Sequence, residues 1–204
     1  MIDFFTKGGV FMYPILLCSI TAVAIFIERL WNLRQTQVIP RDLVHDVEEL
    51  IRREKIHEAA MLCQNNRSSL AQIFLVGIKN FGRTREAIKE HLEEVGRQEG
   101  ASLERFVEGL GTIAGVSTLL GLLGTISGMI KIFSVISSQA VVNPGSLAGG
   151  ISEALITTYA GLSVAIPTIV MYKYLQSKST ALILEMERRS IRLVDLLKEK
   201  KGND

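Results

Sequence analysis

Residues 109–133 read GLGTIAGVSTLLGLLGTISGMIKIF, an apolar stretch in which Lys131 is the single charged residue. The stretch opens a region of 64 residues, 109–172, whose only Asp, Glu, Lys or Arg side chains are Lys131 and Glu153. A membrane-spanning helix needs about 17–25 apolar residues, so this region is long enough for two spans. Charge excluded from so long a segment is typical of a chain embedded in a bilayer and not of a soluble core.

An earlier apolar stretch, residues 10–27, has 18 residues without a charge and predicts a further span. A secretory signal is disfavoured because its apolar region is usually only about 7–15 residues long and ends at a small-x-small cleavage site. No such site precedes Glu28-Arg29. Pro14 lies in the first turns, where a helix tolerates the missing N–H. The sequence therefore predicts an all-helical membrane protein with three spans.

The distribution of Lys and Arg predicts the orientation of these spans. Lys7 is the only such residue before the first span, and the loop 138–146 has none. In contrast, 13 lie in residues 28–108 and eight in the tail that begins at Lys173. Because Lys and Arg accumulate on the cytoplasmic side of a membrane, we expect the N-terminus and the short loop outside and the charged block and the tail in the cytoplasm.

The charged block is expected to be helical. Apolar spacing and polar breaks predict one helix after Pro40 and two more over residues 55–64 and 69–81. No proline interrupts residues 84–137, so we expect one helix there, about 80 Å long, and the third span should continue into the tail in the same way. The predicted segments are an N-terminal segment 1–9, a first span 10–33, a cytoplasmic helical domain 34–108, a second span 109–137, an outer loop 138–147, a third span 148–174 and a cytoplasmic C-terminal helix 175–204.

Small residues recur in the second and third spans. Glycines four residues apart let membrane helices approach closely, and the second span holds two such pairs. Such dense packing implies that the second span is surrounded by other helices. The two remaining spans of one chain are too few to surround it, so the packing indicates an oligomer. The residues expected in helix packing are Gly111, Gly115, Gly121, Gly124, Gly128, Gly161 and Pro167.

Hydroxyl side chains are the second signal in these spans. Thr118 and Thr125 are seven residues apart and share one face of the second span, and a small, partly polar stripe on the third runs from Ala154 through Thr158 to Gly161. A lone Thr in a membrane helix most often bonds a carbonyl of its own helix. Two facing stripes are better evidence for a polar conduit.

An antiparallel hairpin with its apex near residue 142 pairs positions whose numbers add to about 284. Lys131 and Glu153 should then share one depth near the outer surface, and Thr125 and Thr158 another about six residues, or ~9 Å, deeper. Glu153 and Thr158 are about 140° apart around the helix, whereas Thr157 lies within about 40° of Glu153. An ionisable residue inside a membrane is by default a functional candidate; the alternative is a structural ion pair of Glu153 with Lys131.

Residues 119–133 (LLGLLGTISGMIKIF) and 149–172 (GGISEALITTYAGLSVAIPTIVMY) resemble the two transmembrane motifs of the ExbB/TolQ/MotA proton-channel family, most closely those of ExbB and then TolQ. The motifs cover 39 residues and occur in the right order around a short outer loop. The three-span layout with a large cytoplasmic block is similar as well. MotA-like proteins have four spans, so the chain departs from that branch.

The resemblance implies a homopentamer in the bacterial inner membrane, whose second and third spans line a pore. The pore would enclose the single spans of an ExbD- or TolR-like partner that carries the proton-binding aspartate, and a TonB- or TolA-like protein would carry the force across the periplasm. On the family's pattern Thr125 and Thr158 match the pore threonines, Glu153 the third-span glutamate and Pro167 the proline of the VAIP element. The candidates for the proton pathway are Thr118, Thr125, Glu153, Thr157 and Thr158.

Three positions depart from the family's pattern. Ser117-Thr118 stand where Ala-Pro is frequent, Tyr159 replaces a usually small residue, and Lys131 stands where an uncharged or smaller polar residue is common. A lysine facing the pore would raise the barrier to cations. We therefore expect Lys131 to face outward or to pair with Glu153.

The sequence thus predicts a proton-channel subunit of a motor that energises TonB-dependent import. A TolQ-type role in envelope integrity and cell division and a passive scaffold without ion flow are the alternatives, and a solute transporter is disfavoured because the chain has one hairpin and no internal repeat. An enzyme is not expected, since His45, His57, His91, Cys18 and Cys63 make no nucleophile–base pair, disulfide framework or metal spacing. No cofactor, metal or nucleic-acid partner is expected.

Overall fold

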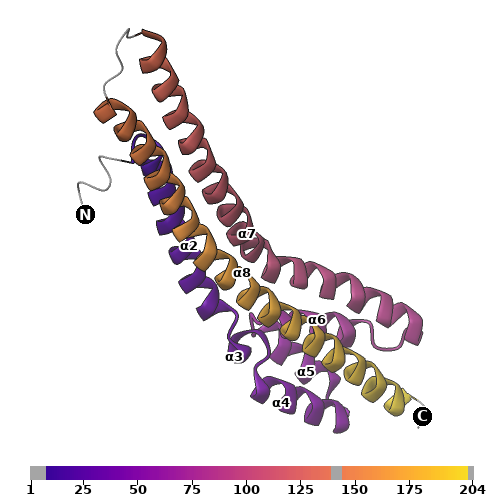
Figure 1. Ribbon diagram of the computed structural model, residues 1–204. Helices are drawn as coiled ribbons and strands as arrows, with labels where there is room; N and C mark the ends of the chain where they lie inside the picture. The colour runs from indigo at the N-terminus through magenta and orange to yellow at the C-terminus, as the bar shows by residue number, and fades with distance from the viewer. Residues whose placement is uncertain (1–7, 139–143, 202–204) are drawn as a thin grey trace. The chain divides into compact units, whose positions relative to one another are not determined.

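The computed structural model describes residues 8–138 and 144–201, and within these ranges the chain is helical without strands (Figure 1). Most of the N-terminal segment 1–9, the centre of the loop 138–147 and the last three residues lie outside the described residues. The helices are α2 (Met12–Asn32), α3 (Gln35–Val38), α4 (Arg41–Arg52), α5 (Ile56–Gln64), α6 (Ser69–Lys79), α7 (Arg85–Ser138) and α8 (Pro144–Lys201).

The two longest helices confirm the expectation that the second and third spans continue without a break into polar segments. α7 has 54 residues and α8 has 58. Pro167 lies inside α8 without ending it. Three helices are long and apolar enough to cross a membrane, Met12–Asn32, Glu86–Ser138 and Leu147–Lys198, in agreement with the three predicted spans. The short α3 was not predicted.

The chain divides into two compact units. Unit 1 contains Met1–Glu28 and Val107–Tyr174, and unit 2 contains Arg29–Phe106 and Leu175–Asp204. The loop-side halves of α7 and α8 therefore belong to unit 1 together with most of α2, and the other halves belong to unit 2 with the short helices. The nearly charge-free region 109–172 falls within unit 1.

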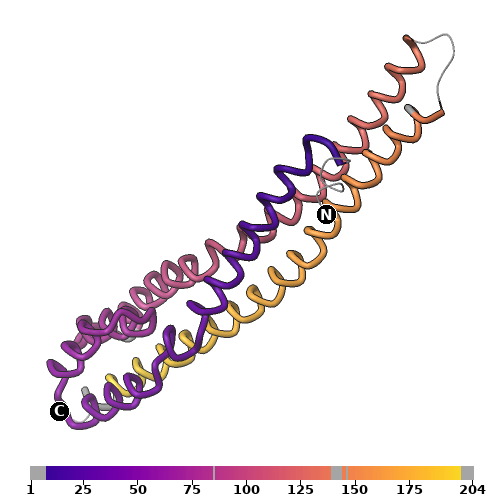
Figure 2. The backbone as a smooth tube through the Cα atoms, turned by 90° about the vertical axis from the view of Figure 1, so that its left-hand side faces the viewer, coloured from indigo at the N-terminus to yellow at the C-terminus, as the bar shows by residue number. Residues whose placement is uncertain are grey.

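Glycines set the contact between α7 and α8 in unit 1, where the two helices run side by side (Figure 2). A Cβ atom added at Gly161 would lie 2.7 Å from the Ser117 carbonyl oxygen and 2.8 Å from Gly121 Cα. Nearer the loop, a Cβ at Gly128 would lie 2.8 Å from the Cβ of Ala154. The residue numbers of the facing pairs 121/161 and 128/154 both add to 282, whereas the predicted register has a sum of about 284.

Unit 2 is held together by a conventional apolar core. Many of its fully buried side chains come from α4, α6 and the second half of α8, and these include Val47, Ile51, Leu70, Ile73, Phe74, Met186, Leu193 and Leu197. An ion pair of 3.1 Å between Arg192 and Glu48 joins α8 to α4. Ser68 caps α6 by accepting a hydrogen bond from the Ala71 N–H at 3.3 Å. These helices therefore form a packed domain of their own outside the apolar spans.

The glycine contact leads to a stability prediction. Gly161→Ala places a methyl group against backbone atoms of α7, which cannot rotate away. Overpacking of this kind costs about 1–3 kcal/mol, and each kcal/mol lowers the unfolding midpoint of a chain this size by about 2–4 °C. We expect a lower midpoint for the detergent-solubilised subunit, measured by far-UV circular dichroism.

Gly149→Ala is the matched control for this substitution. A Cβ at Gly149 meets nothing within 4 Å, and alanine has the higher helix propensity by about 1 kcal/mol. Its midpoint should stay unchanged or rise. Equal midpoints for the two variants would contradict the close approach of α7 and α8.

The thiol of Cys63 is fully buried in α5. Burial raises its pKa from 9.0 to about 11, because desolvation disfavours the thiolate. The thiolate is the nucleophile in alkylation. In a Cys18→Ser variant, labelling by a maleimide should therefore stay slow at pH 8 and increase mainly as the pH approaches about 11. Rapid labelling of the folded protein at pH 8, absent from Cys18→Ser/Cys63→Ala, would contradict this assignment.

Candidate functional site

The two charges of region 109–172 lie together near the loop end of the hairpin. The Lys131 ammonium on α7 donates to Glu153 Oε1 on α8, with an Nζ to Oε1 distance of 2.5 Å. The Glu153 side chain is 20% exposed and that of Lys131 is 55% exposed. The pair therefore links the two helices, and the carboxylate is its more buried member.

The segment that leads into α2 packs on this carboxylate. Gly9 has a φ of +71°, and a Cβ added there would collide with Glu153 Oε1. Thr157, one turn along α8, is fully buried, and its Oγ1 lies 2.6 Å from the Gly8 carbonyl oxygen and 2.8 Å from that of Glu153. One hydroxyl proton thus serves two carbonyls. Glu153 and Thr157, predicted to lie on one side of the helix, both contact the Gly8–Gly9 turn.

Sequence reasoning missed Gly8 and Gly9. A glycine pair before an apolar stretch indicates a turn, but nothing in its spacing shows which residue it contacts. The hydrogen bond between Thr157 and Gly8 joins positions 149 residues apart in the chain. Only the tertiary structure brings them together.

The predicted pore threonines have different partners. Thr158 Oγ1 donates across the hairpin to the Gly121 carbonyl of α7 at 3.0 Å. Thr125 Oγ1 donates to Leu122 O at 2.5 Å, within its own helix. Thr118 is exposed and donates to Ala114 O at 3.0 Å. Because each hydroxyl proton is used on a carbonyl, the oxygen lone pairs remain to accept a hydrogen bond from water or from a protonated acid.

The predicted packing glycines fall into two groups. In α7, Gly121, Gly124 and Gly128 face α8 at Gly161, Thr157 and Ala154 respectively, and Gly111 faces the ring of Tyr172, with a built Cβ 3.4 Å from its Cζ. A Cβ at Gly115, in contrast, meets nothing within 4 Å in this chain. Pro167 is exposed. Four of the five glycines predicted to pack in the second span therefore contact α8 of the same chain.

One buried hydroxyl of α7 is left without a hydrogen bond by the described residues. Ser117 is fully buried next to the Gly121–Gly161 contact, and its Oγ makes no hydrogen bond within residues 8–138 and 144–201. Its carbonyl oxygen is the atom that a Cβ at Gly161 would meet. This is one of the positions at which the sequence departs from the family's pattern.

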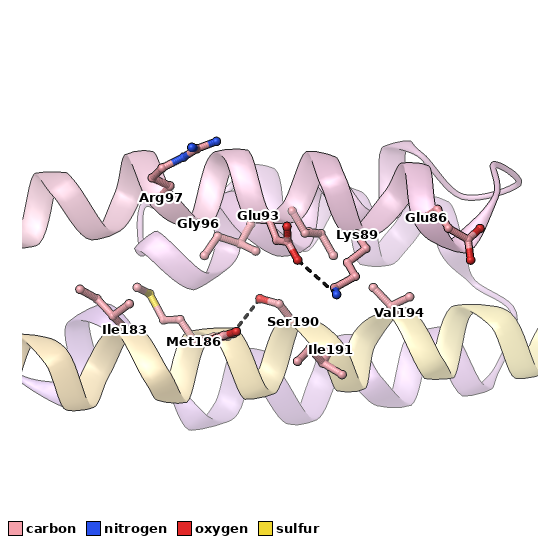
Figure 3. A pocket seen from close by; sticks show the side chains of 13 residues that line it. Glu86, Lys89, Glu93, Gly96, Arg97, Ile183, Met186, Ser190, Ile191 and Val194 are labelled. Carbon is pink, nitrogen blue, oxygen red and sulfur yellow. Dashed lines mark hydrogen bonds and ion pairs between the residues drawn. The ribbon is translucent and has the colours of Figure 1, made fainter.

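Unit 2 contains a separate groove of about 630 Å³ between the first turns of α7 and the last turns of α8 (Figure 3). Its floor is apolar, with Met186 and Ile183 from α8, and its rim on α7 is charged, with Lys89 Nζ 3.4 Å from Glu93 Oε1. In the ranges 8–138 and 144–201, no three His, Cys, Asp or Glu residues are grouped to hold a metal ion. The predicted proton-pathway residues all belong to unit 1.

Comparison with known proteins decides the family. Residues 65–188 match the MotA/TolQ/ExbB proton channel family. The chain belongs to this family. The ExbB-like 3 protein of Synechocystis sp. is 39% identical over 183 residues, covering 87% of each chain. ExbB-like 1 of the same organism is 33% identical over 185 residues, covering 87% of this chain and 71% of that protein.

A TolQ-type relative is similar over nearly the same length. The Tol-Pal system protein TolQ of Haemophilus influenzae is 29% identical over 199 residues, covering 89% of this chain and 86% of that protein. Membership of the MotA/TolQ/ExbB family and the three apolar helices make the chain a multi-pass membrane protein of a proton-channel family. ExbB-type and TolQ-type relatives both match, so the comparison does not separate these two roles.

The contact of Gly9 with Glu153 can be tested by Gly9→Ala. A left-handed backbone costs a non-glycine residue about 1–2 kcal/mol, and the added methyl group also displaces the Glu153 carboxylate. Gly82→Ala is the control, because Gly82 has a φ of +98° but open space around it. We expect Gly9→Ala to lower the unfolding midpoint of the subunit more than Gly82→Ala. Equal decreases would mean that the carboxylate does not fill the space beside residue 9.

Proposed function

We propose that this chain is a proton-channel subunit of an inner-membrane motor that uses the proton motive force to energise TonB-dependent import across the outer membrane. The functional form would be a homopentamer whose second and third spans enclose the span of an ExbD-like partner. A TonB-like periplasm-spanning protein would receive the work. The N-terminus would lie in the periplasm, and unit 2 and the C-terminus in the cytoplasm, as the Lys and Arg distribution predicts.

One observation carries the proposal. In region 109–172, whose only Asp, Glu, Lys and Arg side chains are the paired Lys131 and Glu153, Thr158 and Thr125 provide polarity without charge. Both side chains are half-buried. Each hydroxyl donates its proton to a carbonyl, so the lone pairs on its oxygen can still accept a hydrogen bond. The match to the MotA/TolQ/ExbB family supports a proton as the species that these hydroxyls serve.

The proposed mechanism uses the cost of burying a charge. A charged carboxylate is expensive in an apolar ring, and its protonated form is much less so. When the partner's aspartate is protonated, its O–H can donate to a threonine oxygen; when it is charged, water held by the same hydroxyls can solvate it. Alternation between these two states would bias the movement of the partner's helix. Protons would enter from the periplasm and leave to the cytoplasm.

Substitution of Thr158 tests this function. Thr158→Val keeps the shape of the side chain and removes the hydroxyl, so a water-holding position in the pathway is lost. General acid–base groups typically contribute about 10²–10⁴-fold to a proton-transfer rate. We expect proton uptake by vesicles that contain the subunit and its partner to fall by about tenfold or more, with assembly of the oligomer retained.

Thr180→Val is the matched control. The Thr180 hydroxyl is exposed in unit 2 and donates to Gln176 O at 3.0 Å, within its own helix, so its loss should leave proton uptake unchanged. Full proton uptake by Thr158→Val would refute the assignment of the pathway. Equal uptake in vesicles with and without the partner would instead favour a passive scaffold.

A TolQ-type role is the second candidate, favoured by the identity to TolQ over 86% of that protein's length. The subunit would then serve envelope integrity and cell division with TolR- and TolA-like partners, by the same proton pathway. The two roles are separated by complementation of strains that lack either an ExbB-type or a TolQ-type subunit. Restored outer-membrane import supports the first role, and restored envelope integrity supports the second.

A further inference from the structure

We propose that Glu153 of this chain is a positioning residue and not a proton carrier: Lys131 and the Gly8–Gly9 turn hold it, and it fixes the segment before α2 to the loop end of the α7–α8 hairpin. The inference rests on the proposed function, because it assigns a role within the same site. It concerns one residue of the pathway predicted above and leaves Thr125 and Thr158 in place.

The charge balance of the pair supports a fixed role. A proton carrier alternates between a charged and a neutral form. If Glu153 were neutralised, the Lys131 ammonium at 2.5 Å would lose its counter-charge, and a charge without a counter-charge is costly inside a membrane. The pair is therefore most stable when both members keep their charge, which suits a permanent link between α7 and α8.

The space around the carboxylate supports the same role. Oε1 of Glu153 receives the Lys131 ammonium and lies against Gly9, where even a methyl group has no room. The left-handed backbone at Gly9 brings the main chain this close. The contacts that occupy the carboxylate therefore come from the chain's own N-terminal segment and from α7.

Thr157 completes the attachment of this segment. Its fully buried hydroxyl bridges the carbonyl oxygens of Gly8 and Glu153 at 2.6 and 2.8 Å. Below it, the side chain of Met12 is 4% exposed and lies against Gly8. The Gly8–Gly9 turn thus contacts two polar residues of α8 that are one helical turn apart. Thr157 holds it by a hydrogen bond, and Glu153 holds it by close packing.

The neighbouring hydroxyl points elsewhere. Thr158 follows Thr157 directly but donates to the Gly121 carbonyl of α7. Residues 153 and 157 therefore serve the contact with the N-terminal segment, and residue 158 serves the seam of the hairpin. This separation allows the pair to be fixed while the hydroxyls of the pathway exchange hydrogen bonds.

The decisive experiment compares single and double neutralisation of the pair in the full-length subunit with its partner. Lys131→Met or Glu153→Gln alone leaves one charge without its partner, so we expect proton uptake by vesicles to fall about tenfold or more in each. Lys131→Met/Glu153→Gln removes both charges together, and we expect uptake within about threefold of the wild type. Lys79→Met, an exposed lysine in the last turn of α6, is the control for loss of a positive charge.

A proton carrier gives a different pattern. If the double variant is as inactive as Glu153→Gln, the carboxylate itself is required and the proposal is overturned. Full activity of both single variants also overturns the proposal, because proton uptake then does not depend on the ion pair. Thr158→Val is measured in parallel: if it is fully active, the proposed pathway fails, and the positioning role is judged by the structural measurement below.

The structural measurement is disulfide formation between residues 8 and 156, which does not depend on proton flow. A Cβ at Gly8 would lie 3.1 Å from Ile156 Cγ2, and the Cβ of residue 156 is one bond beyond that atom, which suits a disulfide, whose Cβ atoms are about 3.5–4.5 Å apart. The flexible Met12 side chain, whose Cγ the new Cβ would approach to 2.6 Å, has to move aside. Gly8→Cys/Ile156→Cys in a Cys18→Ser/Cys63→Ala background should crosslink readily. Adding Lys131→Met or Glu153→Gln should slow the crosslink by about tenfold, and an unchanged rate in both overturns the proposal.

Discussion

The close approach of α7 and α8 at Gly121 and Gly161 is the contact on which the hairpin depends. Inside a bilayer, lipid offers no hydrophobic force between helices, so their association relies on packing and interhelical hydrogen bonds. The missing Cβ atoms at Gly121 and Gly161 let the two backbones meet. Thr158 can then reach the Gly121 carbonyl at 3.0 Å. Wider spacing would lose the interhelical hydrogen bond together with the packing.

The same constraint explains where the charges lie. An unpaired charge is costly in the membrane, and region 109–172 carries one positive and one negative side chain, which pair with each other. Their pairing satisfies both without burying net charge. It also leaves the threonines as the polar groups that can change partners, since a hydroxyl both donates and accepts. A hairpin built in this way combines one fixed polar contact with several exchangeable ones.

Much of this architecture is predictable from sequence because its causes are local. The absence of proline from residues 84–137 and the exclusion of charge from 109–172 specify two long helices, found as α7 (Arg85–Ser138) and α8 (Pro144–Lys201). A loop with its apex near residue 142 limits the register of an antiparallel hairpin to a few residues, so facing positions that add to 282 lie close to the expected 284. The helices depend on residues that are near each other in the chain, and the register depends only on the position of the loop that joins two antiparallel helices.

The partners of individual polar groups are not predictable in this way. Thr125 and Thr158 look equivalent in sequence, yet one bonds its own helix and the other bonds across the hairpin. The difference arises because position 158 lies directly beside a glycine carbonyl, which a shift of one residue in register would remove. The Gly8–Gly9 turn is a still stronger case, since no periodicity relates it to Thr157, 149 residues away.

Five residues separate the fixed and the exchangeable polar positions on α8. At about 100° per residue, Glu153 and Thr158 point about 140° apart, so one helix can hold its N-terminal segment on one side and present a hydroxyl at the hairpin seam on another. Thr157 completes the first side because it lies about 40° from Glu153. Helical geometry alone therefore prevents a single spot from serving both roles. The proposed motor needs both, since the hydroxyls would guide a proton only while the helices that carry them keep their positions.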